Sequence, residues 1–186
     1  MKYKGMLVAV AAFAFSGAAA SAQHDHRTMI DIDETTQALL LKDMRGLVVS
    51  LDKLMFALSE GDFDAVARVG EIDLGFGHAK LKAMVKDGAT DEQIQAMREK
   101  MRAKRAARAA GGGTKAGSGM GGGLSQKMPA DFRALGQSMH MMAEDMAIAA
   151  RAVEGTPTAA DFQTVLQGVQ AVTSSCIACH DTYRIR

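Results

Sequence analysis

Two cysteines and a histidine stand close together in the order Cys176-Ile177-Ala178-Cys179-His180, and the chain has no other cysteine. On a helix, residues three and four positions apart share a face, so the two thiols and the imidazole are expected together. Two thiols at this spacing can form thioether bonds to the vinyl groups of one porphyrin, whose iron the histidine then binds. The pentapeptide therefore predicts one covalently attached haem c.

Two other uses of the cysteines fit the sequence less well. A redox-active Cys-x-x-Cys pair is expected at the N-terminus of a helix in a βαβ unit, whereas this pair ends a long apolar helical pattern. A structural zinc site needs further ligands at similar spacing, and no second pair of cysteines exists. We therefore favour haem over a disulfide or zinc.

The first 22 residues have the pattern of a secretion signal. Lys2 and Lys4 precede a short apolar stretch, which ends at the small residues Ala20-Ser21-Ala22. The stretch is shorter than the about 20 apolar residues that cross a bilayer, so we expect no membrane span. The sequence predicts a cleaved signal peptide, 1–22, and a mature protein, 23–186, that is exported to the periplasm.

Composition favours helices and gives no indication of a nucleic-acid binder. The chain has 22 Lys and Arg against 21 Asp and Glu, and loss of the two signal lysines would leave one excess acidic residue. Binding of nucleic acid needs a clear positive excess. Only two prolines, no tryptophan and 14 methionines are more typical of an all-α protein than of a sheet.

Apolar residues that recur every three or four positions predict four long helices, over 34–60, 62–86, 129–153 and 158–183. The first two are joined by a short connection, and so are the last two, so each pair should be an antiparallel hairpin. The predicted fold is an all-α, up-down-up-down four-helix bundle. The apolar stripe of the last helix continues through both cysteines, which places the haem in line with the core.

Residues 88–127, between the second and third of these helices, look like an insertion. A capping box of Thr90 and Gln93 opens a basic helix over 91–110. It is followed by 111–123, where eight of thirteen residues are glycine, as in a flexible linker. We expect the basic helix to present a solvated face; a docking patch for an acidic partner or an anionic lipid surface is the alternative.

With the haem motif at the end of its last helix, the chain resembles the class II c-type cytochromes, which include cytochrome c-prime and its methionine-ligated, cytochrome c-556-like relatives. The resemblance covers the four long helices and not the insertion. It implies that Cys176 and Cys179 form the thioethers, that His180 is the proximal iron ligand, and that Arg184 lies near the haem. It also implies that a homodimer can form through the first helices.

The distal side of the iron would decide the function. In this family that side faces the first helix, and the resemblance makes Met44 the candidate distal ligand of a six-coordinate electron carrier. A methionine on an apolar stripe also serves as ordinary core filling. If Met44 does not bind, Leu40, Leu41 and Leu47 would line an open pocket for nitric oxide or carbon monoxide.

The other histidines and methionines have structural interpretations. Met139, Met142 and Met146 lie on the stripe of the third long helix and should be core. His140 is one position off that stripe, so we expect a boundary or surface residue, and we expect His78 to be half-exposed. A copper(I) site of these methionines with His140, or His140 as an axial ligand, is a weaker alternative.

The sequence thus predicts a periplasmic monohaem cytochrome that carries single electrons to a periplasmic or membrane-bound redox protein. The alternative is a five-coordinate haem protein that binds nitric oxide or carbon monoxide. A haem-free structural or metal-carrying bundle is a third class. No nucleophile with a base, phosphate loop or carboxylate–histidine metal motif is present, so we do not expect an enzyme.

Overall fold

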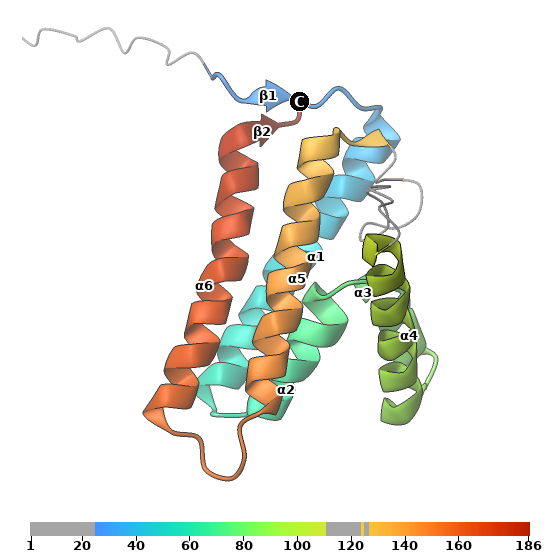
Figure 1. The fold of residues 1–186 in the computed structure, drawn as a ribbon. Coiled ribbons are helices and arrows are strands. Elements are labelled where there is room, and N and C mark those ends of the chain that lie inside the picture. Colours follow the sequence, from blue (N-terminus) through green and yellow to red (C-terminus); the bar gives the residue numbers. More distant parts are fainter. Residues whose placement is uncertain (1–24, 111–123, 125–126) are drawn as a thin grey trace, which may run out of the picture.

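The computed structural model describes residues 25–110, 124 and 127–186, and this part of the chain is helical apart from one short ladder of strands (Figure 1). The expected all-α class is therefore confirmed. The expected signal peptide and the glycine-rich segment lie outside the described residues. In chain order the elements are β1 (Thr28–Met29), α1 (Glu34–Ser59), α2 (Phe63–Arg68), the π-helix η1 (Val69–Leu74), α3 (His78–Lys86), α4 (Asp91–Ala110), α5 (Ala130–Arg151), α6 (Ala159–Thr182) and β2 (Tyr183–Arg184).

Helix starts follow from local capping chemistry. The side chain of Asp33 accepts a hydrogen bond of 2.8 Å from a backbone N–H in the first turn of α1. Thr158 and Asp161 form a reciprocal capping box before α6, and Thr90 and Gln93 form one before α4. Each cap accepts hydrogen bonds from N–H groups that have no carbonyl partner in the first helical turn. Three of the four long helices and the basic helix are confirmed, with ends within two residues of the prediction.

The second long helix is not continuous, and this part of the prediction is wrong. The chain forms α2 and η1, breaks at 75–77, and starts again as α3. Gly77 has a left-handed φ of +74°, which glycine adopts without strain. At Gly75 a Cβ would lie 2.8 Å from two backbone carbonyl oxygens. Gly75 and Gly77 therefore build the turn that interrupts the predicted helix.

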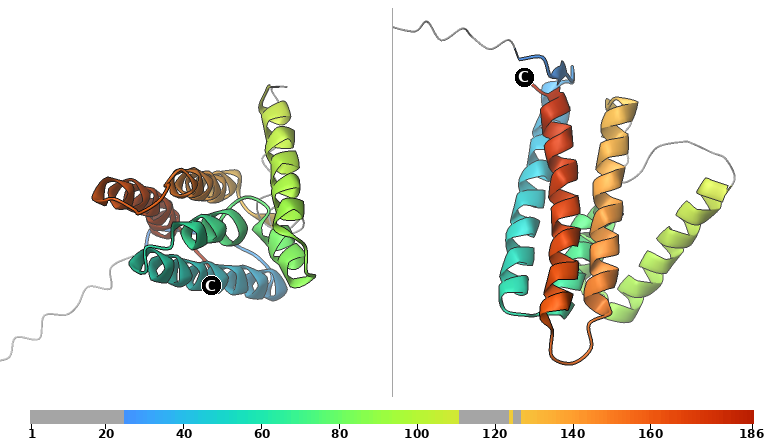
Figure 2. Two further views of the ribbon diagram at one scale, coloured as in Figure 1. Left: turned by 90° about the horizontal axis from the view of Figure 1, so that it is seen from below. Right: turned by 60° about the vertical axis from the view of Figure 1, so that its left-hand side comes forward.

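α3 and α4 pack against each other beside the remaining helices. Leu81 of α3 and Ile94 of α4 are buried with Ile72 of η1 in a small apolar cluster of their own. In Figure 1 these two helices lie to one side of α1, α2, α5 and α6, and Figure 2 shows α4 slanting away from them.

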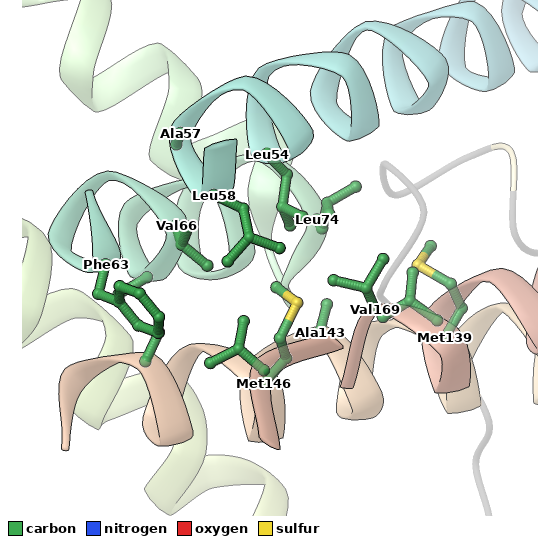
Figure 3. Close-up of a cluster of buried hydrophobic side chains, with 14 residues drawn as sticks. Leu54, Ala57, Leu58, Phe63, Val66, Leu74, Met139, Ala143, Met146 and Val169 are labelled. Atoms are coloured by element: carbon green, nitrogen blue, oxygen red, sulfur yellow. The ribbon is translucent and has the colours of Figure 1, made fainter. Parts of the chain in front are cut away.

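The main apolar cluster joins α1, α2, η1, α5 and α6 (Figure 3). Leu54, Val66 and Val165 within it are completely buried. At Gly70 of η1, a Cβ would lie 2.9 Å from the Cβ of Ala147 on α5. The absence of a side chain there lets the two backbones approach closely.

The two ends of the described chain meet beside the end of α6. β1 pairs in parallel with β2, and the N–H of Ile30 donates to the carbonyl of Arg184 over 2.8 Å. None of the helices in the described ranges is long and apolar enough to cross a membrane.

Candidate functional site

Both cysteines lie in the last turns of α6, as free and half-buried thiols. Cys176 packs against the main apolar cluster, and Cys179 packs in a second cluster near the chain ends. The prediction that the apolar stripe of this helix continues through the cysteines is confirmed. The Cys-x-x-Cys pair therefore spans the junction between the two clusters.

The second cluster, here called the terminal cluster, brings together the start of α1, the start of α5 and the end of α6. Met44 and Leu40 of α1 lie in it with Cys179, and Phe132 packs edge-on against Tyr183 with ring centroids 5.5 Å apart. The structure thus places the candidate distal methionine in the same apolar cluster as one of the haem cysteines. Its members are Ile30, Ile32, Leu40, Met44, Leu124, Met128, Phe132, Cys179, Tyr183 and Ile185.

Both thiols are held in the protonated form. Burial raises the pKa of Cys176 and raises the pKa of Cys179 to about 11, where the neighbouring thiol adds to the effect. The C-terminal end of a helix also disfavours a negative charge. Disulfide exchange and metal binding need the thiolate. This environment therefore disfavours the thiolate that a redox-active pair or a metal site would need.

His180 lies at the edge of this site. Its side chain is exposed, unlike the two thiols, and its backbone carbonyl accepts a hydrogen bond of 3.3 Å from Arg27. Four residues of an α-helix turn through about 400°, so the histidine is rotated past Cys176 toward solvent. The three residues therefore differ in burial, with both thiols half-buried and His180 exposed. The donor set of two thiols and an imidazole nevertheless sits within about one and a half helical turns.

Arg184 contacts the N-terminal segment. It is half-exposed, and its Nε lies 3.5 Å from the carboxylate of Asp25. A hydrogen bond from Arg27 to the same carboxylate holds the pKa of Asp25 well below its usual range. Sequence reasoning missed this segment, because the two residues of β1, Thr28 and Met29, are too few to show the alternation that marks a strand.

The apolar neighbours of Met44 differ in part from the prediction. Leu40 is buried with it in the terminal cluster, but Leu47 packs against the main cluster. Leu41 is exposed and cannot line a buried pocket, which corrects its expected role. A helix turns each residue by about 100°, so Leu41 points away from the face that Leu40 presents.

His78 and His140 are both buried, and the expectation of surface or half-exposed residues is wrong for both. Their rings stack with centroids 5.1 Å apart. Nδ1–H of His140 donates to the carbonyl of Leu74 at the end of η1, and Nε2 of His78 lies 3.4 Å from the carboxylate of Asp43. Burial lowers the pKa of His140, although the hydrogen bond to Leu74 acts in the opposite direction. The imidazole is therefore neutral near pH 7.

Met139, Met142 and Met146 of α5 pack in the core, as predicted, whereas Met141 is exposed. Met139 and Met146 are buried, and Met142 packs partly buried against the same cluster. The hydroxyl of Ser175 donates to the sulfur of Met142 over 3.1 Å. Within the described ranges, His, Cys, Asp and Glu side chains form no group of three or more that could hold a metal ion.

The basic helix α4 does not present a uniformly solvated face. Lys100 and Lys104 are exposed, but Arg98 is buried and forms an ion pair of 2.7 Å with Glu71 of η1. The expected solvated face is thus correct for the lysines and wrong for Arg98. Sequence periodicity predicts an exposed position for Arg98, because its buried partner, Glu71, lies 27 positions earlier in the chain.

Comparison of the chain with protein-family models, with curated proteins and with solved structures found no match. The functional argument therefore depends on the residues of the chain itself, on their geometry, and on the resemblance carried by the haem motif.

Proposed function

We propose that this chain is a class II-like c-type cytochrome with one haem c attached to Cys176 and Cys179. The observation that carries the proposal is the position of the two thiols. They lie three residues apart and turn inward at the junction of two apolar clusters, with Met44 in one of those clusters. When bound there, haem supplies one-electron chemistry that no side chain of the protein can perform.

In this proposal each residue has a separate role. The two cysteines hold the cofactor on α6, and the imidazole of His180 serves as the proximal ligand, supported by its position one residue after Cys179. The Met44 thioether is the distal ligand, and thioether ligation stabilises ferrous iron and raises the reduction potential. Arg184 would lie near the haem, as the family resemblance implies. The apolar members of the terminal cluster would exclude water.

We further propose that α1, α2 with η1, α5 and α6 form the up-down-up-down four-helix bundle of this family. Support comes from the side-by-side arrangement of these helices in Figures 1 and 2 and from the one apolar cluster that they share. The second member of the bundle is short, since α3 leaves to pack with α4.

The function that this site supports best is single-electron transfer in the periplasm, to a periplasmic or membrane-bound redox protein, without catalysis of a substrate reaction. Export rests on the signal-peptide pattern of 1–22. Fractionation of cells that express the full chain tests it: we expect haem-bearing protein in the periplasmic fraction, shortened near Gln23. Uncleaved protein in the cytoplasm would contradict the assignment.

A five-coordinate haem protein that binds nitric oxide or carbon monoxide is the second candidate. The observation that favours it is Leu40, which is more deeply buried than Met44 in the same cluster. If Leu40 rather than Met44 faces the iron, the distal side would be apolar and open.

The first experiment tests attachment of the cofactor. The full chain is expressed in a host with cytochrome maturation, and haem is detected on a denaturing gel and by intact mass. We expect one haem per chain and none in a double variant in which Cys176 and Cys179 are replaced by serine. A wild-type mass equal to that of the bare polypeptide would remove the proposal.

The second experiment separates the two haem functions. Met44→Ala is compared with Met141→Ala, which removes an exposed methionine from α5. If Met44 binds iron, only the first variant loses the long-wavelength ferric absorption of a sulfur-ligated haem, becomes high-spin and gains carbon monoxide affinity. A high-spin wild type, unchanged in both variants, would establish the gas-binding alternative.

A second copy of the chain is the partner that we propose for the outer face of α1. Leu41, Val48 and Met55 are exposed at intervals of seven residues, and Phe56 extends the same apolar surface. Seven-residue spacing is the repeat of a paired helix seam. Light scattering should give a dimer for the wild type and a monomer for Val48→Glu; a monomeric wild type at high concentration would contradict the homodimer.

A further inference from the structure

A charged groove of about 490 Å³ lies where α4 meets α2, η1 and α5. Four arginines line it, whereas only two acidic side chains do. The arginines are Arg68, Arg98, Arg102 and Arg151, and the acids are Glu71 and Asp91. In Figure 1 α4 lies on the opposite side of the molecule from α6, so the groove is separate from the haem motif.

Glu71 is the buried anion of the groove, and its acceptor capacity is already used. One oxygen lies 2.7 Å from Nη1 of Arg98, and the other accepts from Nη2 of Arg151 over 3.1 Å and from Gln95 over 3.3 Å. Two guanidinium groups thus share one carboxylate. Glu71 therefore leaves no acceptor for the remaining N–H groups of the groove.

The outer arginines have their own acidic partners. Arg68 lies 2.7 Å from Asp91, and Arg151 also lies 3.2 Å from Asp64, whose side chain is almost fully exposed. Solvent screens both contacts, and exposed pairs of this kind are weak. They do not supply an acceptor to the buried part of the groove.

Two N–H groups of the groove therefore stand out. Nη2 of Arg98 and Nη2 of Arg102 are buried and have no hydrogen-bond partner among the described residues. The Arg98 side chain is only 4% exposed, while Nε of Arg102 makes a long ion pair of 3.7 Å with Glu144. A buried donor without an acceptor costs about 1–3 kcal/mol, so both groups favour an added acceptor.

The two donors belong to one face of α4, because Arg98 and Arg102 are four residues apart. Burial lowers the pKa of Arg98; the charge of Arg102 acts in the same direction, whereas Glu71 opposes it. A guanidinium nevertheless stays protonated in proteins. Arg98 is paired with Glu71 and Arg102 with Glu144, so the two groups lack an acceptor for Nη2 rather than a counter-charge.

We propose that this groove is a binding site for a small oxyanion, a phosphate or a carboxylate, held by Nη2 of Arg98 and Nη2 of Arg102. Planar guanidinium groups form strong charge-assisted hydrogen bonds to the paired oxygens of such ligands. The bound anion would accept hydrogen bonds from the two Nη2 atoms, which have no acceptor among the described residues. It would also strengthen the attachment of α4, because it supplies the acceptor that its buried arginines lack.

Titration calorimetry on the full haem-loaded protein tests the site, with inorganic phosphate as the probe and sodium chloride added to hold ionic strength constant. We expect saturable binding of one phosphate per chain and an increase in thermal stability that chloride alone does not give. A parallel titration with succinate distinguishes the two ligand sources. Absence of saturable heat with both anions would overturn the proposal.

Two variants locate the binding. Arg102→Met should weaken it about ten- to hundredfold, as expected for the loss of a charge-assisted hydrogen bond. Lys104→Met removes the same charge from an exposed position of α4 and should leave phosphate binding unchanged. Equal weakening in both variants would show non-specific attraction, and no weakening in Arg102→Met would place binding elsewhere; either result would overturn the proposal.

Arg98→Lys keeps the charge opposite Glu71 but removes the second donor, so binding should weaken with the fold retained. Circular dichroism checks that fold independently. Wild-type affinity in a folded Arg98→Lys variant would also contradict the proposed site.

Discussion

Replacement of Gly70 by alanine tests how closely η1 approaches α5. A Cβ on this residue would lie 2.9 Å from the carbonyl oxygen of Ala143, the Cβ of Ala147 and the terminal carbon of Met146. Real Cβ atoms do not come so close to other heavy atoms. The methionine tip can rotate away, but the carbonyl and the alanine can move only if the two helices separate.

The expected change in the free energy of unfolding follows from two opposing effects. Alanine is a better helix former than glycine by about 1 kcal/mol, which favours the variant. Overpacking of a tight core costs about 1–3 kcal/mol, and here a backbone atom has to move, so the upper part of that range applies. We expect Gly70→Ala to lower the free energy of unfolding by about 1–2 kcal/mol.

Gly46 is the matched control. It also lies inside a helix, α1, but a Cβ there meets no other atom within 4 Å. Gly46→Ala should therefore raise the free energy of unfolding by about 0.5–1 kcal/mol. Urea unfolding followed by circular dichroism measures the free energy of unfolding of both variants. In a separate thermal melt, their midpoints should differ by roughly 5–10 °C. Stabilisation by both substitutions would refute the close approach of η1 and α5.

Three further changes have defined outcomes. Glu71→Gln leaves Arg98 without a buried counter-charge and should lower the free energy of unfolding by about 3 kcal/mol in urea, whereas Asp64→Asn, at an exposed partner of the same network, should change it by less than about 0.5 kcal/mol. Burial lowers the pKa of His140 in the folded state below the ordinary 6.5, so the unfolded chain binds more protons than the folded chain below that pH. The contribution of His140 to the free energy of unfolding is therefore fully present above about pH 6.5 and falls as the pH drops, by up to about 1.4 kcal/mol per pH unit. The same pH dependence in a His140→Gln variant would contradict this. Thr158→Ala removes the capping box of α6 and should cost about 1 kcal/mol in thermal or urea unfolding; an unchanged midpoint would show that the cap does not contribute.

Helices whose start and apolar stripe are both local could be predicted from the sequence. α1 begins after Asp33 and α6 after Thr158, where the capping side chain and the N–H it accepts from lie within three residues. The break between η1 and α3 could not, because Leu74 and Leu81 keep helical spacing across it. Only the tertiary structure shows that they face different clusters.

The buried polar residues were the other failure of prediction. His140 finds the carbonyl of Leu74, 66 positions earlier, and Arg98 finds Glu71, 27 positions earlier. A polar residue is buried when a distant partner satisfies it, and periodicity carries no information on such a partner. Cys176 and Cys179 were easier to place, because they continue an apolar stripe that packing alone turns inward.

The separation of the terminal cluster from the main cluster separates the candidate site from most of the stability of the fold. Leu54, Val66 and Val165, all completely buried, belong to the main cluster, whereas Met44 and Cys179 are half-buried members of the terminal cluster. A half-buried side chain leaves a smaller cavity when it is truncated, and its loss therefore costs less than that of a fully buried one. Substitution of Met44 should consequently leave the protein folded, so that a change in its spectrum reports ligation of the iron rather than unfolding.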